Sequence, residues 1–202
     1  MTIRAVFLDK DGTLIENVPY NVNPNLIRLS PFAGPALQLL SEEGYALFVI
    51  TNQAGIANGL FTESALLDVH ERIQELLAEY HVNLRGFYYC PHSPTGKVKP
   101  YALHCTCRKP FAGMLYAAAR EHDIDLDQSW MIGDILNDVE AGRRAGCRTI
   151  LVDNGNETEW LLTGWRMPHL IAHDLRIAAN VIVNSSDQKM AIDSLIPFGK
   201  SG

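Results

Sequence analysis

Two acidic residues stand two positions apart in the segment Asp9-Lys10-Asp11-Gly12-Thr13, directly after an apolar run. A carboxylate at such a place can attack phosphorus and form an aspartyl-phosphate. A second acid two residues later can protonate the leaving oxygen and then deprotonate water. Gly12 allows the sharp turn that would bring both acids over one site. The alternative is a polar loop, because the pattern D-x-D-G also occurs in calcium-binding loops.

Two further segments could hold a phosphate. Thr51, Asn52 and Gln53 follow a second apolar run. A hydroxyl and backbone N–H groups there can bind a phosphate oxygen, although such residues also serve as helix caps or turn residues. Arg108 and Lys109 supply two cations: the lysine could balance the charge of the first acid, and the arginine offers a bidentate fork. A basic pair taken alone usually lies on a solvated surface.

A third acidic segment runs from Gly133 to Asp138. Asp134 ends a predicted strand, where it could complete a Mg²⁺ site with Asp9, because Mg²⁺ is bound by few carboxylates together with water and phosphate oxygens. Asp138 would fall in the first turn of the next helix, where a negative charge stabilises the helix by about 0.3–1 kcal/mol. We therefore rank Asp138 well below Asp134 as a functional residue.

Three cysteines and one histidine form two tight pairs, Cys90-Pro-His92 and Cys105-Thr-Cys107, on either side of a polar loop. Three thiolates and one imidazole make a closed tetrahedral site, which zinc fills in a structural role. Such a site can hold together a loop that has no core of its own. A disulfide and buried free thiols are the alternatives, and free thiols would not explain the pairing.

Two other residues of the same types are less suited to this metal site. His104 is a rival nitrogen ligand, but its neighbour Cys105 would make the pair a strained chelate. Cys147 stands alone, and we expect it to be a small core residue. The zinc loop (90–107) runs directly into Arg108 and Lys109. Metal binding would therefore place two cations at the phosphate.

The elements that must position these residues alternate along the chain. The pattern predicts helices and strands as follows: strands at 3–9, 45–51, 86–90, 129–134 and 148–152, helices at 30–44, 62–80 and 137–146, and a last strand at 180–184 followed by a helix. Strand–helix alternation with continuously apolar strands predicts an α/β fold, a Rossmann-like, mostly parallel sheet with helices on both faces. Ligands bind beyond the carboxyl ends of such strands, where Asp9, Thr51 and Asp134 would lie.

The 202 residues fit a single domain over 1–202, with an irregular excursion at 154–175 to which we attach no chemistry. The net charge of −6 argues against a nucleic-acid or membrane-surface partner. The start of the chain has no signal-peptide pattern and no segment approaches the roughly 20 apolar residues of a membrane span. We expect a cytoplasmic monomer.

The order of nucleophilic acid, hydroxyl, lysine and metal-binding acid resembles the haloacid dehalogenase superfamily of phosphatases across residues 3–153. The resemblance implies that Asp9 is the nucleophile and Asp11 the general acid and base. It implies that Thr51 and Lys109 stabilise the phosphoryl group, and that Asp134 is the remaining Mg²⁺ ligand. Asp11 would reach the metal through its backbone carbonyl.

The segments YYCPH and CTCRKP look like those of the D,D-heptose 1,7-bisphosphate phosphatases, and DKDGT, TNQAGIANGLFTE and CRKPFAGML fit that family as well. Histidinol-phosphate phosphatases share the metal but have a shorter loop than the twelve residues (93–104) found here. Position 135, often basic in close relatives, is Ile135. By the same resemblance, substrate contacts would come from the segments 17–20 and 51–54 and from position 108: Asn17, Tyr20, Asn52, Gln53, Ala54 and Arg108.

We therefore expect a Mg²⁺-dependent phosphomonoester hydrolase that removes the 7-phosphate of D-glycero-D-manno-heptose 1,7-bisphosphate, as in the synthesis of bacterial surface glycans. The stretch 14–51 leaves no room for a large cap domain. The alternatives are a histidinol-phosphate phosphatase, another small-phosphosugar phosphatase or a phosphotransferase. A phospho-receiver and a zinc-stapled interaction module belong to other classes. Asp11 argues against the receiver, and the intact motifs argue against the module.

Overall fold

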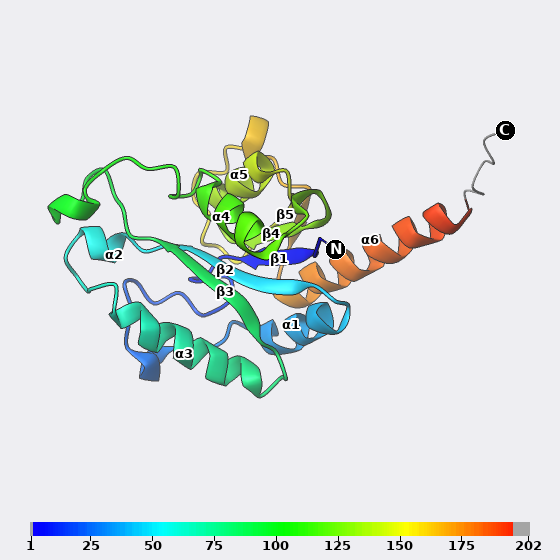
Figure 1. The fold of residues 1–202 in the computed structure, drawn as a ribbon, viewed down its shortest axis with the longest axis horizontal. Coiled ribbons are helices and arrows are strands. Elements are labelled where there is room, and N and C mark those ends of the chain that lie inside the picture. Colours follow the sequence, from blue (N-terminus) through cyan, green and yellow to red (C-terminus); the bar gives the residue numbers. More distant parts are fainter. Residues whose placement is uncertain (1, 196–202) are drawn as a thin grey trace.

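The computed structural model describes residues 2–195, and their side chains up to residue 185. Its centre is a sheet of six parallel strands in the order β3-β2-β1-β4-β5-β6 (Figure 1). The strands are β1 (Ala5–Leu8), β2 (Ala46–Asn52), β3 (Leu84–Cys90), β4 (Trp130–Gly133), β5 (Arg148–Val152) and β6 (Leu170–Ala172). The order reverses between β1 and β4, the place where ligands bind in open sheets of this kind.

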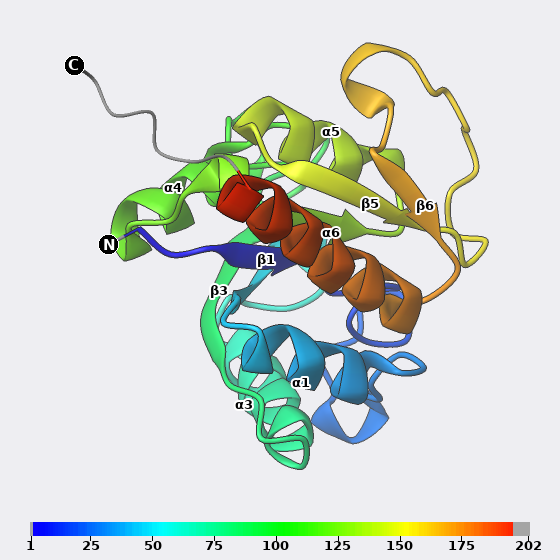
Figure 2. The same ribbon diagram turned by 90° about the vertical axis from the view of Figure 1, so that its right-hand side faces the viewer.

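Helices cover both faces of the sheet, as Figure 2 shows. The first face carries α1 (Ala33–Glu42), α3 (Ala65–Ala78) and α6 (Leu175–Leu195), and the second carries α4 (Gly113–His122) and α5 (Leu136–Ala145). Successive strand residues alternate between the two cores: Val6 and Leu8 face the first, whereas Ala5 and Phe7 face the second. Successive side chains of a strand point to opposite faces of the sheet, so one continuous apolar run packs into both cores.

The predicted parallel α/β sheet is confirmed, and five strands and three helices lie where the sequence placed them. Cys147 is buried in the second core, as expected of a small core residue. Between β1 and β2 the chain forms only the 3₁₀ helix η1 (Pro24–Leu26) and α1, which agrees with the absence of a large cap domain in this connection. A four-residue helix, α2 (Ala54–Ala57), follows β2 at the carboxyl edge of the sheet.

The predicted strand at 180–184 is wrong, because these residues belong to α6. The run Val181-Ile182-Val183 has the composition of a strand. However, Leu175, Ala178, Ala179 and Ile182 are the buried residues, and their spacing of three and four is that of one helix face. Packing of this face against α1 and the sheet overrides the local β-propensity.

Helix α4 and strand β6 were not predicted. Helix α4 buries Met114, Leu115 and Ala118, which provide only a short apolar stripe. Strand β6 lies within the segment expected to be irregular and adds to the edge of the sheet beside β5. The rest of that segment, from 154 to 169, has no regular element except the 3₁₀ helix η4 (Gly164–Arg166). Among residues 2–195, no helix is both long and apolar enough to cross a membrane.

The helical assignment of 180–184 gives a stability prediction. Ile182 is fully buried in the core between α6 and the sheet. We expect Ile182→Ala to lower the free energy of unfolding by about 2–5 kcal/mol, the range for a large-to-small change in a packed core. Asn184→Ala, an exposed position of the same helix, should change it by less than about 0.5 kcal/mol. Urea denaturation measures both values, and equal effects would contradict the packing described here.

Candidate active site

Polar residues gather where three neighbouring strands end. Asp9 follows β1 directly, Asp134 follows β4, and Thr51 lies one residue before the end of β2. The carboxyl ends of these adjacent parallel strands meet at one edge of the sheet. The three residues line one cavity of about 250 Å³ together with Lys109. The structure thus brings together four of the residues predicted to act on a phosphate.

The ammonium group of Lys109 is at the centre of this cluster. It donates hydrogen bonds to Asp9 Oδ1 and to the carbonyl oxygen of Ile50, the latter at 2.8 Å, and it forms an ion pair with Asp138 Oδ1 at 2.6 Å. An ammonium has three N–H donors, and these hydrogen bonds use two of them. The residue is only 3% exposed, and water therefore competes little for these bonds.

Buried carboxylates outnumber the buried cation. Asp9, Asp134 and Asp138 place carboxylate oxygens within 4.8 Å of one another. Burial raises the pKa of Asp9 to about 7, although Lys109 opposes the shift. Burial, followed by the charge of Asp9, raises the pKa of Asp134 to about 6. Three ionised acids beside one lysine leave two negative charges, and this oxygen-rich set fits a hard divalent cation such as Mg²⁺.

The carboxylate of Asp134 is held on both oxygens. Its Oδ1 accepts a hydrogen bond from Thr13 Oγ1 at 3.1 Å, and its Oδ2 accepts one from Asn156 Nδ2 at 2.7 Å. Gly12 has a φ of +90° and lies so close that a Cβ atom there would overlap the Asp134 carboxylate. A glycine at this position therefore lets the loop after β1 pack against the acid that follows β4.

Asp138 has a more central position than we expected from a helix N-terminal charge. It is fully buried and forms the ion pair with Lys109. Its second oxygen accepts a hydrogen bond from the backbone N–H of Ile135 at 3.3 Å, so the helix-end contact is present as well. A Cβ atom on Gly133 would overlap this side chain. Asp138 thus helps to hold Lys109 in place beside Asp9.

Asp11 lies beside the acid cluster, and its side chain is not part of it. Its Oδ2 accepts a hydrogen bond from Gln53 Nε2 at 3.1 Å, and its Oδ1 pairs with Lys10 Nζ at 2.9 Å. The same Gln53 nitrogen donates to Thr51 Oγ1 at 2.8 Å and so links the two residues. The Asp11 side chain is 32% exposed, against 11% for Asp9. Water can therefore reach Asp11, which suits a group that exchanges protons with solvent.

A second cavity of about 230 Å³ adjoins the first and shares Asp11, Asn17 and Asn52 with it. Tyr20 and Ala54, two of the predicted substrate contacts, line this second cavity. The predicted contacts from segments 17–20 and 51–54 therefore lie together. Ile135, which replaces a basic residue of the resembled family, lines the first cavity. Its side chain offers no charge to a ligand there.

The side chains of Asn52 and Arg108, both predicted substrate contacts, form hydrogen bonds with the protein backbone. The side-chain amide of Asn52 donates to the carbonyl oxygen of Lys109 and accepts from its N–H, both at 3.0 Å. Arg108 donates from Nη1 to the carbonyl oxygen of His92 at 3.2 Å. It lines a separate cavity of about 100 Å³ beside the zinc loop, and neither of the two larger ones. In this structure Asn52 fixes the backbone of Lys109, whereas Arg108 faces the loop.

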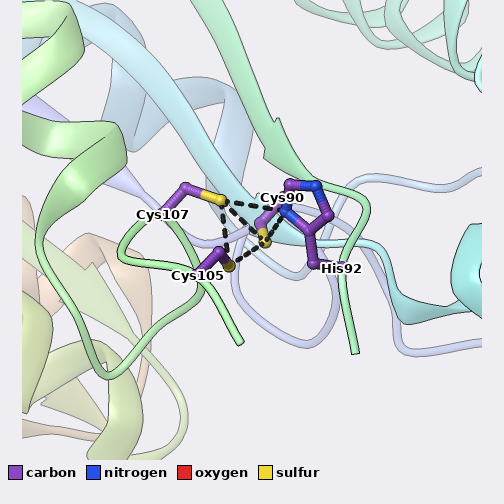
Figure 3. Close-up of side chains that lie close together, drawn as sticks. All are labelled: Cys90, His92, Cys105 and Cys107. Atoms are coloured by element: carbon purple, nitrogen blue, oxygen red, sulfur yellow. Dashed lines mark hydrogen bonds between the residues drawn. The ribbon is translucent and has the colours of Figure 1, made fainter. Parts of the chain in front are cut away.

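A second candidate metal site lies at the end of β3 (Figure 3). The Sγ atoms of Cys90, Cys105 and Cys107 are 3.1, 3.2 and 3.5 Å apart, and all three are free thiols. His92 Nδ1 lies 3.3 Å from Cys107 Sγ and 3.6 Å from Cys90 Sγ. Tetrahedral Zn–S bonds of about 2.3 Å would separate the sulfurs by about 3.8 Å, so the four donors fit zinc. His104 is not part of the cluster.

The loop between these ligand pairs is also tied at its far end. Glu63, which precedes α3, accepts hydrogen bonds from the hydroxyl groups of Tyr101 and Tyr89 at 2.5 Å each. These two bonds lower the pKa of Glu63. The carbonyl oxygen of Ala57, at the end of α2, accepts from Lys97 N at 2.7 Å. The loop therefore packs against the helix that borders the second cavity.

Two residues of the site lie in the segment 154–175, to which we attached no chemistry. Asn154 donates from Nδ2 to the carbonyl oxygen of Gly12 at 2.6 Å, and Asn156 donates to Asp134. The sequence Asn-Gly-Asn at 154–156 is a turn signal, and it begins two residues after the end of β5. A turn at the carboxyl end of a parallel strand lies at the ligand-binding edge, so this signal could have indicated the contact.

Comparison with known proteins gives consistent matches. Residues 106–178 match the model of HAD-hydrolase-like proteins. A D-glycero-β-D-manno-heptose-1,7-bisphosphate 7-phosphatase of Photorhabdus laumondii is 39% identical over 184 residues, covering 91% of each chain. One of Yersinia pestis is 40% identical over 157 residues, which are 76% of this chain and 82% of the relative. The solved D,D-heptose 1,7-bisphosphate phosphatase of B. bronchiseptica, complexed with magnesium and phosphate, is 27% identical. It matches with a TM-score of 0.74, over 91% of this chain and 99% of that one.

The raised pKa values of Asp9 and Asp134 give a pH prediction. Both lie above the ordinary value of 3.8, so between pH 3.8 and about 7 the folded state binds protons that the unfolded state has released. The contribution of these acids to stability is therefore lost as pH rises through this window. A bound divalent cation removes the penalty of the ionised acids, and it competes with these protons. We expect the increase in Tm caused by millimolar Mg²⁺ to grow from pH 5 to about pH 7 and then level off.

The difference between Tm with and without Mg²⁺ is the required readout, because His70 and His169 also make stability depend on pH. Their pKa values are lowered by burial, so they destabilise the fold as pH falls and act in the opposite direction. Chelators must be left out of the buffer so that a bound zinc ion is not stripped. In Asp134→Asn the increment should be small at every pH. An increment in the native protein that is the same at pH 5 and pH 8 would contradict the prediction.

Proposed function

This chain is a phosphatase that belongs to the family of the D-glycero-β-D-manno-heptose-1,7-bisphosphate 7-phosphatases, within the haloacid dehalogenase-like hydrolases, and we propose that it removes the 7-phosphate of D-glycero-D-manno-heptose 1,7-bisphosphate. The observation that carries the proposal is the position of Lys109 between Asp9 and Asp138, with Asp134 in the same cavity. A neighbouring cavity of about 230 Å³ has room for part of a sugar.

In the first step, Asp9 attacks the phosphorus of the 7-phosphate in line with the bond to the sugar oxygen. The P–O bond to the sugar breaks, and Asp11 donates a proton to the departing oxygen. The product is an aspartyl-phosphate on Asp9 and the free 7-hydroxyl group. Because the Lys109 ammonium contacts Asp9 directly, it is placed to offset the negative charge that develops beside this carboxylate.

In the second step, water attacks the aspartyl-phosphate and releases inorganic phosphate. Asp11 takes a proton from this water and returns to the state in which it can protonate the next substrate. Its exposure of 32% supports this role, because a general base for hydrolysis needs access to water. Thr51, which is linked to Asp11 through Gln53, would hold a phosphate oxygen with its hydroxyl group.

We propose that Asp9, Asp134 and the backbone carbonyl of Asp11 hold Mg²⁺. When bound, the ion would neutralise charge on the phosphoryl oxygens as a Lewis acid. The excess of buried carboxylates over Lys109 supports this assignment. So does the magnesium in the structure of the B. bronchiseptica relative.

We also propose that Cys90, His92, Cys105 and Cys107 hold a structural zinc ion. The last ligand is two residues from Lys109, so fixing the loop also fixes the approach of the chain to the acid cluster. Three thiolates must stay reduced for this site to form. The cytoplasm provides such conditions, and we place the activity there. We propose a single domain that acts as a monomer on a small phosphosugar, with no nucleic-acid or membrane partner.

The substrate and the nucleophile are tested together by phosphate release with Mg²⁺ present. The panel contains both anomers of the heptose 1,7-bisphosphate and histidinol phosphate. We expect a strong preference for one heptose bisphosphate. Asp9→Asn removes the nucleophile and should lower kcat by at least about 10³-fold. Asp68→Asn, at an exposed position of α3, is the control and should keep native activity.

Each outcome of this assay separates two classes of function. A preference for histidinol phosphate would keep the chemistry and overturn the sugar substrate. Transfer of phosphate to an added sugar, with no inorganic phosphate released, would indicate a phosphotransferase. Equal activity of the native protein and Asp9→Asn would reject Asp9 as nucleophile. A stable phospho-Asp9 would favour a receiver.

The zinc site gives a separate prediction. We expect about one zinc ion per chain by elemental analysis of the native protein. Cys107→Ser should lose the zinc and lower kcat by roughly tenfold or more, because it frees the segment that ends in Lys109. His104→Ala, next to a ligand but outside the cluster, should retain both. Zinc that is retained by Cys107→Ser, or lost from His104→Ala, would show that the ligand set is wrong.

A further inference from the structure

The turn 154–156, after β5, fastens two acid-bearing loops to each other. Asn154 Nδ2 donates to the carbonyl oxygen of Gly12 at 2.6 Å, within the loop that carries Asp9 and Asp11. Asn156 Nδ2 donates to Asp134 Oδ2 at 2.7 Å. The backbone N–H of Asn156 donates to Asn154 Oδ1 at 3.3 Å, which fixes the two side chains relative to each other. One turn therefore contacts both sides of the acid cluster.

The bond from Asn156 determines how the Asp134 carboxylate is oriented. Thr13 holds Oδ1 and Asn156 holds Oδ2, so rotation of the carboxylate would break one bond or both. A carboxylate oxygen has about two acceptor positions, and each oxygen therefore keeps one for a further partner. Asn156 lines the same cavity as Asp9 and Asp134, so its amide is at the place where that partner would bind.

The rest of the segment has anchors of its own. Glu157 accepts hydrogen bonds from the backbone N–H groups of Leu136, Thr158 and Glu159 at 2.5, 2.8 and 2.7 Å. Leu162 packs against the small cluster formed by Leu136, Val139 and Leu151. The excursion is thus attached to α5 without the amide of Asn156. If Asn156 served only to anchor the segment to the fold, there would be no reason for its amide to point at the buried carboxylate of Asp134.

We propose that Asn156 is a positioning residue for divalent-cation binding, which orients Asp134 within the acid cluster. This inference rests on the Mg²⁺ site of the proposed function. A side chain that orients a metal-binding residue typically changes metal affinity by about 10–100-fold when it is removed. The amide also donates to a carboxylate that is only 3% exposed, and a lost hydrogen bond costs more at such a buried group than at the surface.

The test measures Mg²⁺ binding directly by isothermal titration calorimetry, without substrate. We expect Asn156→Ala to raise the Kd for Mg²⁺ by about tenfold or more. Asn156→Leu keeps a similar side-chain volume but has no donor, and it should show the same loss. Thr158→Ala changes an exposed side chain of the same segment and should bind Mg²⁺ as the native protein does. The kcat of Asn156→Ala should approach the native value once Mg²⁺ is saturating, with KM for the phosphosugar unchanged.

A native Mg²⁺ affinity in Asn156→Ala or Asn156→Leu would overturn the inference. So would a fall in kcat at saturating Mg²⁺ with an unchanged Kd, because Asn156 would then act on the phosphosugar or only on the fold. Calorimetry measures the binding of Mg²⁺ alone. The Kd for Mg²⁺ therefore does not depend on whether the proposed substrate is correct. Failure of the proposed substrate and failure of this inference are therefore distinguishable.

Discussion

The balance of buried charge around Lys109 is the constraint on which the rest of the site depends. One ammonium lies among three buried carboxylates; it donates hydrogen bonds to Asp9 and to the Ile50 carbonyl and forms an ion pair with Asp138. Burying a cluster of charged side chains is energetically costly unless every charge has a partner. A further positive charge would balance the cluster, so a bound cation would contribute to its stability as well as to its chemistry.

Distant segments have to meet accurately for this balance to exist. The strand order places β1 beside β4, but Asp134 reaches the first loop only because Gly12 leaves room for it. Lys109 follows no strand of the sheet. Its backbone is held by Asn52 on one side, and it lies two residues beyond the last thiol of the proposed zinc site. We infer that the zinc loop positions Lys109 at the site, as the ends of β1 and β4 position Asp9 and Asp134.

Much of this arrangement could be predicted from the sequence, because parallel strands impose where their ends lie. Apolar runs that end in Asp9 and Asp134 predicted the parallel sheet. They also predicted the edge of the sheet at which the site forms. The burial of Asp138 could not be predicted in this way, since an acid in a first helical turn has the same local signal whether it faces water or Lys109. The strand predicted at 180–184 failed for a related reason: tertiary packing selected the helical spacing of Leu175 and Ile182 over the local preference of a β-branched run.

The linings of the two cavities indicate how a ligand would be divided between them. The first contains the acids and Lys109, so a transferred phosphate belongs there. In the second, Lys10 and Asp11 pair with each other, and the remaining lining residues are uncharged. Amide and hydroxyl groups such as those of Asn17 and Tyr20 match the hydroxyl groups of a sugar better than another phosphate. Ile135 is uncharged as well, and the described residues place no unpaired cation in either cavity. Selectivity at this site therefore has to come from hydrogen bonds to the sugar.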